Sequence, residues 1–177
     1  DREIADSAEP GDIIGIPNHG TLRVGDTLSE RNDVRFTGLP NFAPEILRRV
    51  VLRDPTKTKQ LRKALDDLSE EGVIQVFYPE IGSNWIIGVV GQLQLDVLIS
   101  RLEAEYKVDA FLEAAPYDTA RWLIGAENAL AQFISFNGGN MAKDRDGHPV
   151  FMARSSWDVG YQQEKHPDVK FSATKER

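Results

Sequence analysis

Residues 54–78, DPTKTKQLRKALDDLSEEGVIQVFY, contain the pattern that decides the fold. Asp54 followed directly by a proline is typical of a helix start, with the acid as N-cap and the proline in the first turn. Leucine and alanine side chains recur three and four residues apart from Leu61 onward, and Gly72 stands where a left-handed C-cap is favoured. The apolar run over residues 73–78 then predicts a strand. This stretch therefore predicts an amphipathic helix that leads directly into a strand.

The neighbouring segments extend this helix and strand into an α+β unit. A run of Ile, Leu and Val precedes the helix, a second strand pairs with the first in antiparallel fashion, and a second helix with one apolar stripe follows. The order strand, helix, strand, strand, helix, strand is the split βαβ arrangement of ferredoxin-like domains, with a core at about residues 45–125. The elements are expected at residues 46–52, 54–72, 73–78, 85–90, 92–106 and 108–113, and a further strand at 119–124 completes the unit.

The segments outside this core have a different pattern of apolar, glycine and proline residues. Within residues 1–33, short apolar runs at 11–17 and 21–28 are punctuated by Gly, Pro and Asn, which is typical of barrel strands joined by tight turns. Two such strands are marginal alone, so we interpret them as the end of a larger β-barrel. Residues 34–177 form the second domain, in which 126–177 is an α/β extension. No repeat of fixed period is visible. In the extension we expect a helix at 127–136, a strand at 149–153 and a last helix ending near residue 165.

Composition limits the classes of function. The chain has 177 residues, 41% of them hydrophobic, which suits one compact domain with a fragment attached. Its 21 Lys and Arg against 28 Asp and Glu give a net charge of −7, so nucleic acid or an anionic membrane must meet a local basic patch. The lack of cysteine excludes a disulfide scaffold, zinc fingers and a thiol nucleophile, and no apolar run approaches the roughly 20 residues that span a bilayer. We expect no membrane partner.

The sequence contains few patterns that are typical of catalytic or metal-binding sites. None of the three histidines has a second histidine or a carboxylate at a helical metal-ligand spacing, and no glycine-rich phosphate loop is present. Asp144 and Asp146, followed by Gly147, resemble the start of a calcium loop, but the remaining ligands of such a loop are missing and a plain turn is favoured. We therefore predict no catalytic, cofactor-binding or metal-binding residues in this chain.

Positive charge is concentrated in one window. Between residues 48 and 63 the chain carries seven Lys and Arg residues and one acid, Asp54. A basic helix start opposes the helix dipole, which is unfavourable unless the charge is used. The block suits contact with RNA phosphates, and a solvated helix face with salt bridges is the alternative. The candidate contacts are Arg48, Arg49, Arg53, Lys57, Lys59, Arg62 and Lys63.

The three tryptophans lie in apolar strand and helix patterns. Trp85 belongs to a predicted strand, Trp122 to the strand at 119–124, and Trp157 to the last helix. We interpret them as core or domain-interface residues rather than as platforms for stacking bases.

Several motifs carry a resemblance to known families. Those that carry it are Asn18–Thr21, Gly25–Thr27, Phe36–Glu45, Leu68–Gly72, Gly91–Leu98, Thr119–Trp122 and His166–Phe171. The first two resemble the last strands of the barrel domain of translational GTPases, and the motifs at 68–72 and 91–98 resemble the third domain of elongation factor G-type proteins. The other three resemble the class II peptide-chain release factors, the bacterial termination GTPases.

That resemblance implies a role in protein biosynthesis in the cytoplasm. The chain would be a C-terminal portion that contains the end of the barrel and the third domain, without enzymatic activity of its own. GTP or GDP and magnesium would bind in a missing N-terminal GTPase domain. The implied partners are that domain and the ribosome, both its RNA and its proteins, with a functional link to the codon-reading release factor, whose dissociation the factor would promote; DNA is not expected.

Two other functions stay open at this point. A fragment of an elongation factor G-type translocase would continue into further domains, which the tail argues against. A self-standing hydrolase on a ferredoxin-like scaffold needs an anion-cradling loop after the first strand, where Pro55 lacks a free N–H. Fold alone does not imply such activity.

Overall fold

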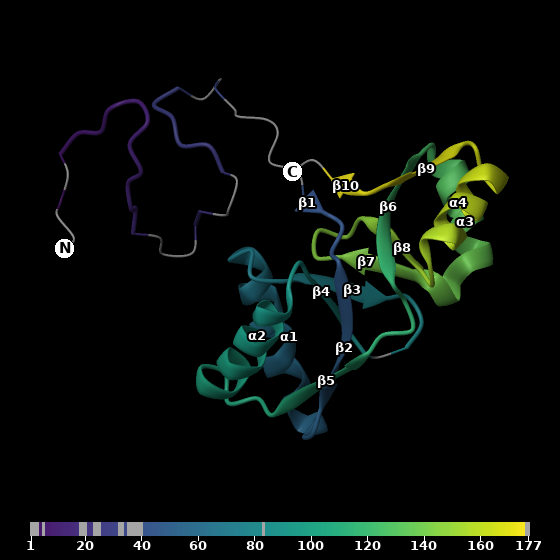
Figure 1. The fold of residues 1–177 in the computed structure, drawn as a ribbon, viewed down its shortest axis with the longest axis horizontal. Coiled ribbons are helices and arrows are strands. Elements are labelled where there is room, and N and C mark those ends of the chain that lie inside the picture. Colours follow the sequence, from purple (N-terminus) through teal and green to yellow (C-terminus); the bar gives the residue numbers. More distant parts are fainter. Residues whose placement is uncertain are drawn as a thin grey trace.

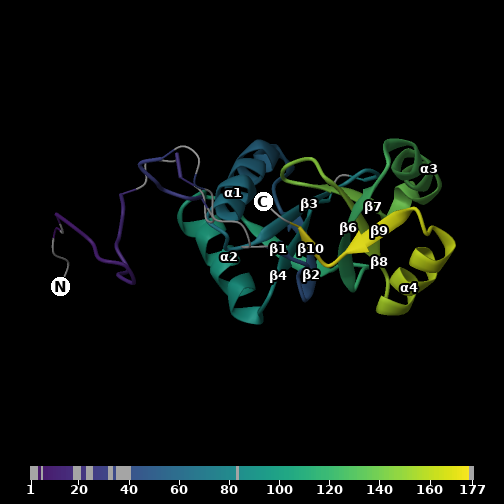
Figure 2. The ribbon, with the colours of Figure 1, turned by 90° about the horizontal axis from the view of Figure 1, so that it is seen from above.

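The computed structural model describes residues 4, 6–17, 21–22, 26–31, 34, 41–82 and 84–175. Two helix pairs lie at opposite ends of its folded part, with strands between them (Figure 1). Figure 2 shows the same division from above. The described residues before Asn41 contain no assigned helix or strand, so the barrel remains an expectation, and the motif at 18–20 lies outside the described residues.

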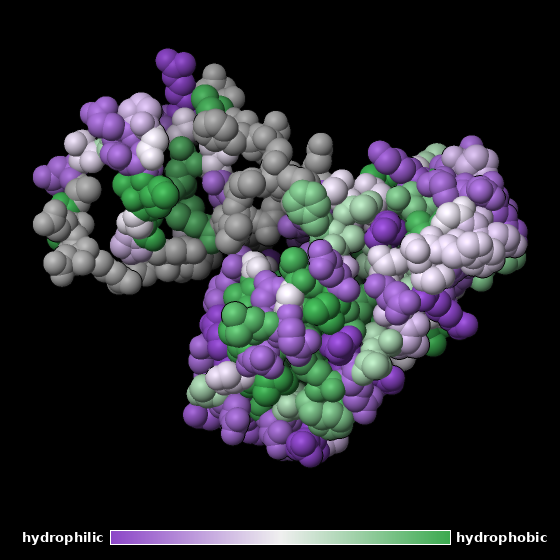
Figure 3. Space-filling view, in the orientation of Figure 1, coloured by the Kyte–Doolittle hydropathy of each residue, from purple (hydrophilic) through white to green (hydrophobic). Residues whose placement is uncertain are grey.

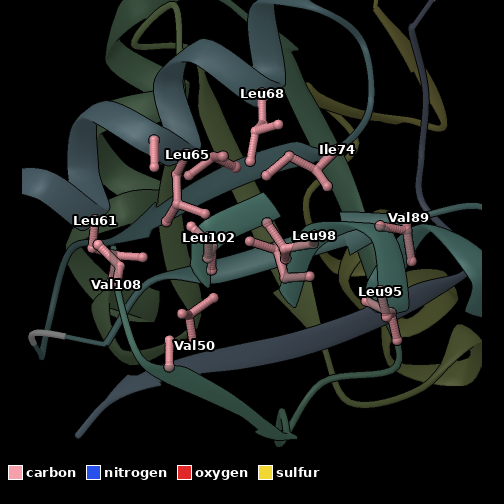
Figure 4. Packing of buried hydrophobic residues seen from close by; sticks show 14 residues of the cluster. Val50, Leu61, Leu65, Leu68, Ile74, Val89, Leu95, Leu98, Leu102 and Val108 are labelled. Carbon is pink, nitrogen blue, oxygen red and sulfur yellow. The ribbon is translucent and has the colours of Figure 1, made fainter. Parts of the chain in front are cut away.

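The first half of the structure is the predicted ferredoxin-like unit. Its strands are ordered β5-β2-β4-β3 in the sheet, and every neighbouring pair is antiparallel. Helices α1 and α2 pack on one face of these strands around a cluster that includes Leu65 and Leu98 (Figure 4). The fold class predicted from the sequence is therefore confirmed. The elements are β2 (Ile46–Leu52), the 3-10 turn η1 (Pro55–Lys57), α1 (Thr58–Glu70), β3 (Gln75–Pro79), β4 (Ile86–Val89), α2 (Gln92–Ala104) and β5 (Ala110–Ala114).

The start and end of the first helical segment follow the predicted signals. The carboxylate of Asp54 accepts hydrogen bonds from the backbone N–H and the hydroxyl of Thr56, at 3.0 and 2.6 Å. These bonds lower the pKa of Asp54. A 3-10 turn precedes the α-helix, so the cap acts on η1 rather than directly on α1. At the other end, Gly72 adopts a φ of 75°, which glycine tolerates without a Cβ clash.

The second half repeats the same topology, which the sequence analysis did not foresee. Its strands are ordered β7-β8-β6-β9, the same arrangement as in the first unit, with α3 and α4 as the two helices. Strand β6 pairs with β8 and β9, so the assignment of the strand at 119–124 to the first unit is wrong. The α/β extension is thus the larger part of a second split βαβ unit that begins at β6. The elements are β6 (Thr119–Gly125), α3 (Glu127–Asn137), the 3-10 turn η2 (Gly138–Asn140), β7 (Met141–Asp144), β8 (Pro149–Ala153), α4 (Ser156–Lys165) and β9 (Val169–Ser172).

The two units join edge to edge through β3 and β7. Residue Tyr78 faces Lys143 across this ladder, with Phe77 opposite Asp144, so one sheet of eight strands results. Because side chains alternate along a strand, Tyr78 and Met141 lie on the same face, which the helices of both units cover.

On the other face of the sheet, side chains of the two units pack against each other. Leu47, Phe77 and Ile86 from the first unit pack with Trp122, Val150 and other side chains from the second in one shared cluster. A shared core means that neither unit can turn away without exposing apolar surface to water. The two units therefore behave as one body.

A short ribbon ties the beginning and the end of the folded part together. Strand β1 (Asn41–Phe42) pairs with β10 (Thr174–Lys175), and the backbone N–H of Ala43 donates to the carbonyl of Ala173 at 2.7 Å. The side-chain amide of Gln75 in β3 donates to the carbonyl of Phe42 at 2.7 Å. The ribbon is thus anchored to the first unit by Gln75.

Candidate functional site

The seven predicted basic residues do not form one patch. Arg48 and Arg49 are neighbours on β2, so they point to opposite faces of the sheet. Arg48 shares its side with Val50, which packs under the helices, and Arg49 shares its side with Leu47 in the cluster between the units. The alternation of side chains along β2 is therefore enough to place Arg48 and Arg49 on different surfaces.

All four arginines of the block have contacts within the chain. Arg48 donates to the carbonyl of Leu47 at 2.9 Å. Arg49 forms an ion pair with Glu113 at 3.7 Å, and its Nε is buried without a hydrogen bond among the described residues. Arg53 pairs with Asp109 at 3.2 Å and lies over the ring of Phe111. Arg62 lies 5.5 Å from the centre of the Tyr78 ring, whose hydroxyl donates to Asp66. For Arg49 and Arg53 the salt-bridged alternative describes the structure, whereas the contact of Arg62 is with an aromatic ring.

Burial of Tyr78, reinforced by the hydrogen bond to Asp66, raises the pKa of its phenol. The hydroxyl therefore stays protonated and keeps donating to that carboxylate. The ring that Arg62 covers is consequently neutral and fixed in place.

Lys57 lies at the C-terminal end of α2 with a second lysine that the sequence analysis did not single out. The ammonium of Lys57 donates to the carbonyl of Lys107 at 2.5 Å, and Lys107 donates to the carbonyl of Ala104 at 2.9 Å. Cations at the last turn of a helix are favoured by its dipole. Lys107 lies in a turn, where its backbone has a positive φ of 55°. No sequence motif predicted this turn, so the sequence did not indicate the position of Lys107.

Lys59 and Lys63 are the two members of the block left for a partner. They lie four residues apart on α1, and both are exposed. Within the described part of the chain neither forms an ion pair or a side-chain hydrogen bond. The first turn of α1 also lacks an acid that would offset them. These two lysines, flanked by Lys57 and Arg62, form what we call the α1 basic face.

The junction of the two units holds an open cleft of about 430 Å³. Polar groups from both sides line it, and the ion pair between Glu70 and Arg145 crosses from one unit to the other. The other ionisable residues around the cleft are Asp26, Asp144, Asp146, His148 and Lys175.

Asp144 organises this junction. One carboxylate oxygen accepts the backbone N–H groups of Asp146 and His148, at 3.0 and 2.9 Å, which shapes the turn predicted from the sequence. The other oxygen accepts the indole N–H of Trp122 at 3.0 Å and the ammonium of Lys175 at 2.7 Å. Asp144 is almost fully buried, so each of these donors replaces a water molecule.

Lys175 supplies the cation for the acidic cluster. Its ammonium also lies 2.7 Å from a carboxylate oxygen of Asp146, and this hydrogen bond lowers the pKa of Asp146. Asp144, Asp146 and His148 place ligand-type atoms within 4.8 Å of one another. The ammonium between the two carboxylates performs there the charge compensation that a bound cation would otherwise provide. The β1–β10 ribbon is thereby anchored to the second unit as well.

Two of the three tryptophans pack against other apolar side chains, as the sequence analysis expected. Trp85 packs edge-on against Tyr78 with ring centres 5.8 Å apart, and Trp122 is 4% exposed. Trp157 on α4 is 72% exposed, so it is not a core residue, and its interpretation as a domain-interface residue stays a prediction. Helix α4 is too short for its apolar spacing to predict which side packs against the sheet.

Helix α2 leaves apolar side chains exposed on the side away from its core. Leu93 and Val97, four residues apart on α2, are 74% and 39% exposed, and Val90 just before the helix is 59% exposed. In Figure 3, green atoms are visible among purple ones over the lobe of α1 and α2. The sequence analysis identified the buried stripe of α2 correctly and missed this second one.

Residues 36–163 match the sequence model of the family described as class II release factor RF3, C-terminal domain. This span covers more than two thirds of the chain and runs from before β1 into α4. The chain belongs to this family. The matched portion is therefore the C-terminal domain of a translation-termination GTPase factor, as the motifs at 36–45 and 119–122 indicated. Strand β9 of this release-factor domain follows the matched span and completes the second unit.

No helix among the described residues of the release-factor domain is long and apolar enough to cross a bilayer.

Proposed function

We propose that this release-factor domain acts by binding the ribosome, as the non-catalytic part of a GTPase that promotes departure of the codon-reading release factor. The family match supports the termination context, and the α1 basic face supplies cations for RNA phosphates. In this proposal GTP or GDP and magnesium bind in a GTPase domain of the factor, which is also a partner, and the work takes place in the cytoplasm.

The shared core supports a mechanical role. The two units pack around one cluster, and the ribbon anchors β1 to Gln75 on one side and, through β10, to Asp144 on the other. A body braced in this way rotates as a whole when the chain that enters at Asn41 is moved. Such rigid-body rotation is a common way to convert a nucleotide state into a change of domain orientation.

The α1 basic face is the part of the predicted block that we carry into this proposal. Lys59 and Lys63 form no ion pair among the described residues, whereas Arg49 and Arg53 are paired. Lys59 lies in the first turn of α1, where a cation is unfavourable for the helix dipole unless a partner neutralises it. Ribosomal RNA is the polyanion that the termination context provides.

The alternatives gain no support from the structure. A translocase fragment is disfavoured by the release-factor match over residues 36–163. For the hydrolase, the segment after β2 is the η1 turn, in which Pro55 has no N–H and Asp54 places a carboxylate where an anion would need to bind.

A competition experiment tests the proposal. The 177-residue chain is added to a reconstituted termination reaction that contains a full-length factor of the same family. We expect the chain to slow departure of the codon-reading release factor in a concentration-dependent manner, while peptide release itself is unchanged. Departure at the uninhibited rate, with the chain in large excess over ribosomes, would contradict the proposal.

A further inference from the structure

Two exposed aromatic rings on α4 form a parallel stack. Trp157 and Tyr161 lie one helical turn apart with ring centres 5.4 Å apart and planes inclined by 13°. Their exposed fractions are 72% and 44%. The two rings are stacked with an offset, and most of the surface of Trp157 stays open to solvent. Large rings left in water are costly, and they are enriched where proteins meet partners.

Gly160 leaves open space beside this stack. It lies three residues after Trp157, on the same side of α4, and a Cβ added to it would meet no atom within 4 Å. Its backbone is not in the positive-φ region, and glycine inside a helix is less stable than alanine. Neither packing nor conformation therefore explains the glycine, and its effect is to keep the side of the rings accessible. We call Trp157, Gly160 and Tyr161 the α4 shelf.

The charges around the shelf are mixed. The ammonium of Lys165 lies 5.7 Å from the centre of the Tyr161 ring, and the exposed Arg154 precedes the helix. Asp158 and Glu164 lie on the same helix and offset these cations. In Figure 3 the lobe of α3 and α4 is mostly white and purple on the side shown. The shelf is thus a small aromatic surface within polar surroundings.

A nucleobase fits this combination better than a protein surface does. Protein hot spots are usually ringed by further apolar contacts that exclude water, which the polar residues of α4 do not offer. A base needs one flat π face, tolerates polar surroundings and is helped by a nearby cation. The near balance of charge argues against a long phosphate track and in favour of a single unpaired base.

We propose that the α4 shelf binds one unpaired base of ribosomal RNA by stacking it on Trp157. This inference deepens the proposed function and rests on it, because it names a second contact of the same domain with the ribosome. The two contacts differ in physics. Stacking depends weakly on salt, whereas the α1 basic face acts through phosphates and loses strength as salt rises.

The test measures binding of the 177-residue chain to ribosomes over a series of salt concentrations. Trp157→Ala removes the stacking ring, and Gly160→Leu fills the open space while both rings remain. Phe136→Ala is the matched control, because Phe136 on α3 is 77% exposed and lies outside the shelf. Thermal unfolding of each variant is recorded, and a variant that is unfolded at the assay temperature is replaced by Trp157→Leu.

We expect Trp157→Ala and Gly160→Leu each to weaken binding by about fivefold or more at every salt concentration, with the salt slope unchanged. The control should bind as the unaltered chain does. Ultraviolet irradiation of the complex should cross-link RNA to the peptide that contains Trp157. Unchanged affinity of both shelf variants would overturn the inference, and so would a cross-link from this peptide to a ribosomal protein.

A separate probe distinguishes failure of the shelf from failure of the proposed function. If the unaltered chain does not bind ribosomes, the proposed function fails, and octa-adenylate RNA then tests the shelf alone. Quenching of tryptophan fluorescence by this RNA in the unaltered chain, and its loss in Gly160→Leu, would support the stacking site. Equal responses of the two proteins would overturn it.

Discussion

Replacement of Lys175 by methionine tests the junction between the two units. The side chains of Lys175 and Asp144 are 11% and 10% exposed, so the substitution leaves a buried carboxylate without its cation. Removing one partner of a buried pair costs about 3–5 kcal/mol. Asp144 keeps the indole N–H of Trp122 and two backbone N–H groups, so we expect a loss at or just below the lower limit, about 2–3 kcal/mol.

Urea unfolding at pH 7, followed by tryptophan fluorescence, measures this loss. Lys170→Met is the matched control, because Lys170 lies exposed on β9 and should change stability by no more than about 0.5 kcal/mol. Adding Asp144→Asn to Lys175→Met should restore part of the stability, since the uncompensated charge is gone. A Lys175→Met protein as stable as the control would refute the reasoning.

The same variant has an expected pH dependence. Lys175 lowers the pKa of Asp146, so this carboxylate contributes stability above its unfolded pKa and loses it as the pH falls through the lowered folded pKa. Without Lys175 the main cause of the lowered pKa is lost, so the contribution of Asp146 is smaller. The stability difference between the parent and the variant should therefore shrink when the pH is taken below about 4.

Four further substitutions probe other parts of the fold. Leu65→Ala and Leu98→Ala, both at fully buried positions of one cluster, should each cost about 2–5 kcal/mol in urea unfolding, and losses well under 1 kcal/mol would show that the helices do not share a core. Gly88→Ala should lower the melting temperature, because its Cβ would lie 2.5 Å from a ring carbon of Pro44; an unchanged value in calorimetry would contradict this packing. Burial and nearby Asp67 raise the pKa of Tyr106 to about 12, so the stability that it contributes is complete below pH 10 and is lost between about pH 10 and 12. Tyr106→Phe should lose less stability over that range, and identical curves would refute the assignment.

The first unit was predictable because each of its elements carries a local signal. Strand β2 matches the predicted range 46–52, and α1 has its leucine stripe, its acidic cap and Gly72. These signals depend on burial and on backbone chemistry within a few residues, so they can be recognised without knowing which strands pair.

The second unit was hidden because two of its strands carry almost no signal. Strand β7 has four residues, among them Lys143 and Asp144, and β9 has four as well. Short strands of mixed polarity follow from pairing with β3 and β6, which a single sequence does not reveal. The two units repeat a topology rather than a sequence, so no period was visible.

The candidate site was predictable in composition and not in arrangement. The alternation of strand β2 already separates Arg48 from Arg49 and could have been used. The pairing of Arg49 with Glu113 depends on the register between β2 and β5, and the exposure of Trp157 depends on which side of α4 packs. Both are tertiary facts without a local signal.

The central claim is that this domain works by contact with ribosomal RNA, and equilibrium binding to ribosomes tests it most directly. The dissociation constant of the unaltered chain and of Lys59→Gln with Lys63→Gln is measured between 50 and 300 mM salt. The account predicts that the double substitution weakens binding and reduces the log–log salt slope by roughly 1.5, the share of two phosphate contacts. Equal slopes for the two proteins would contradict it.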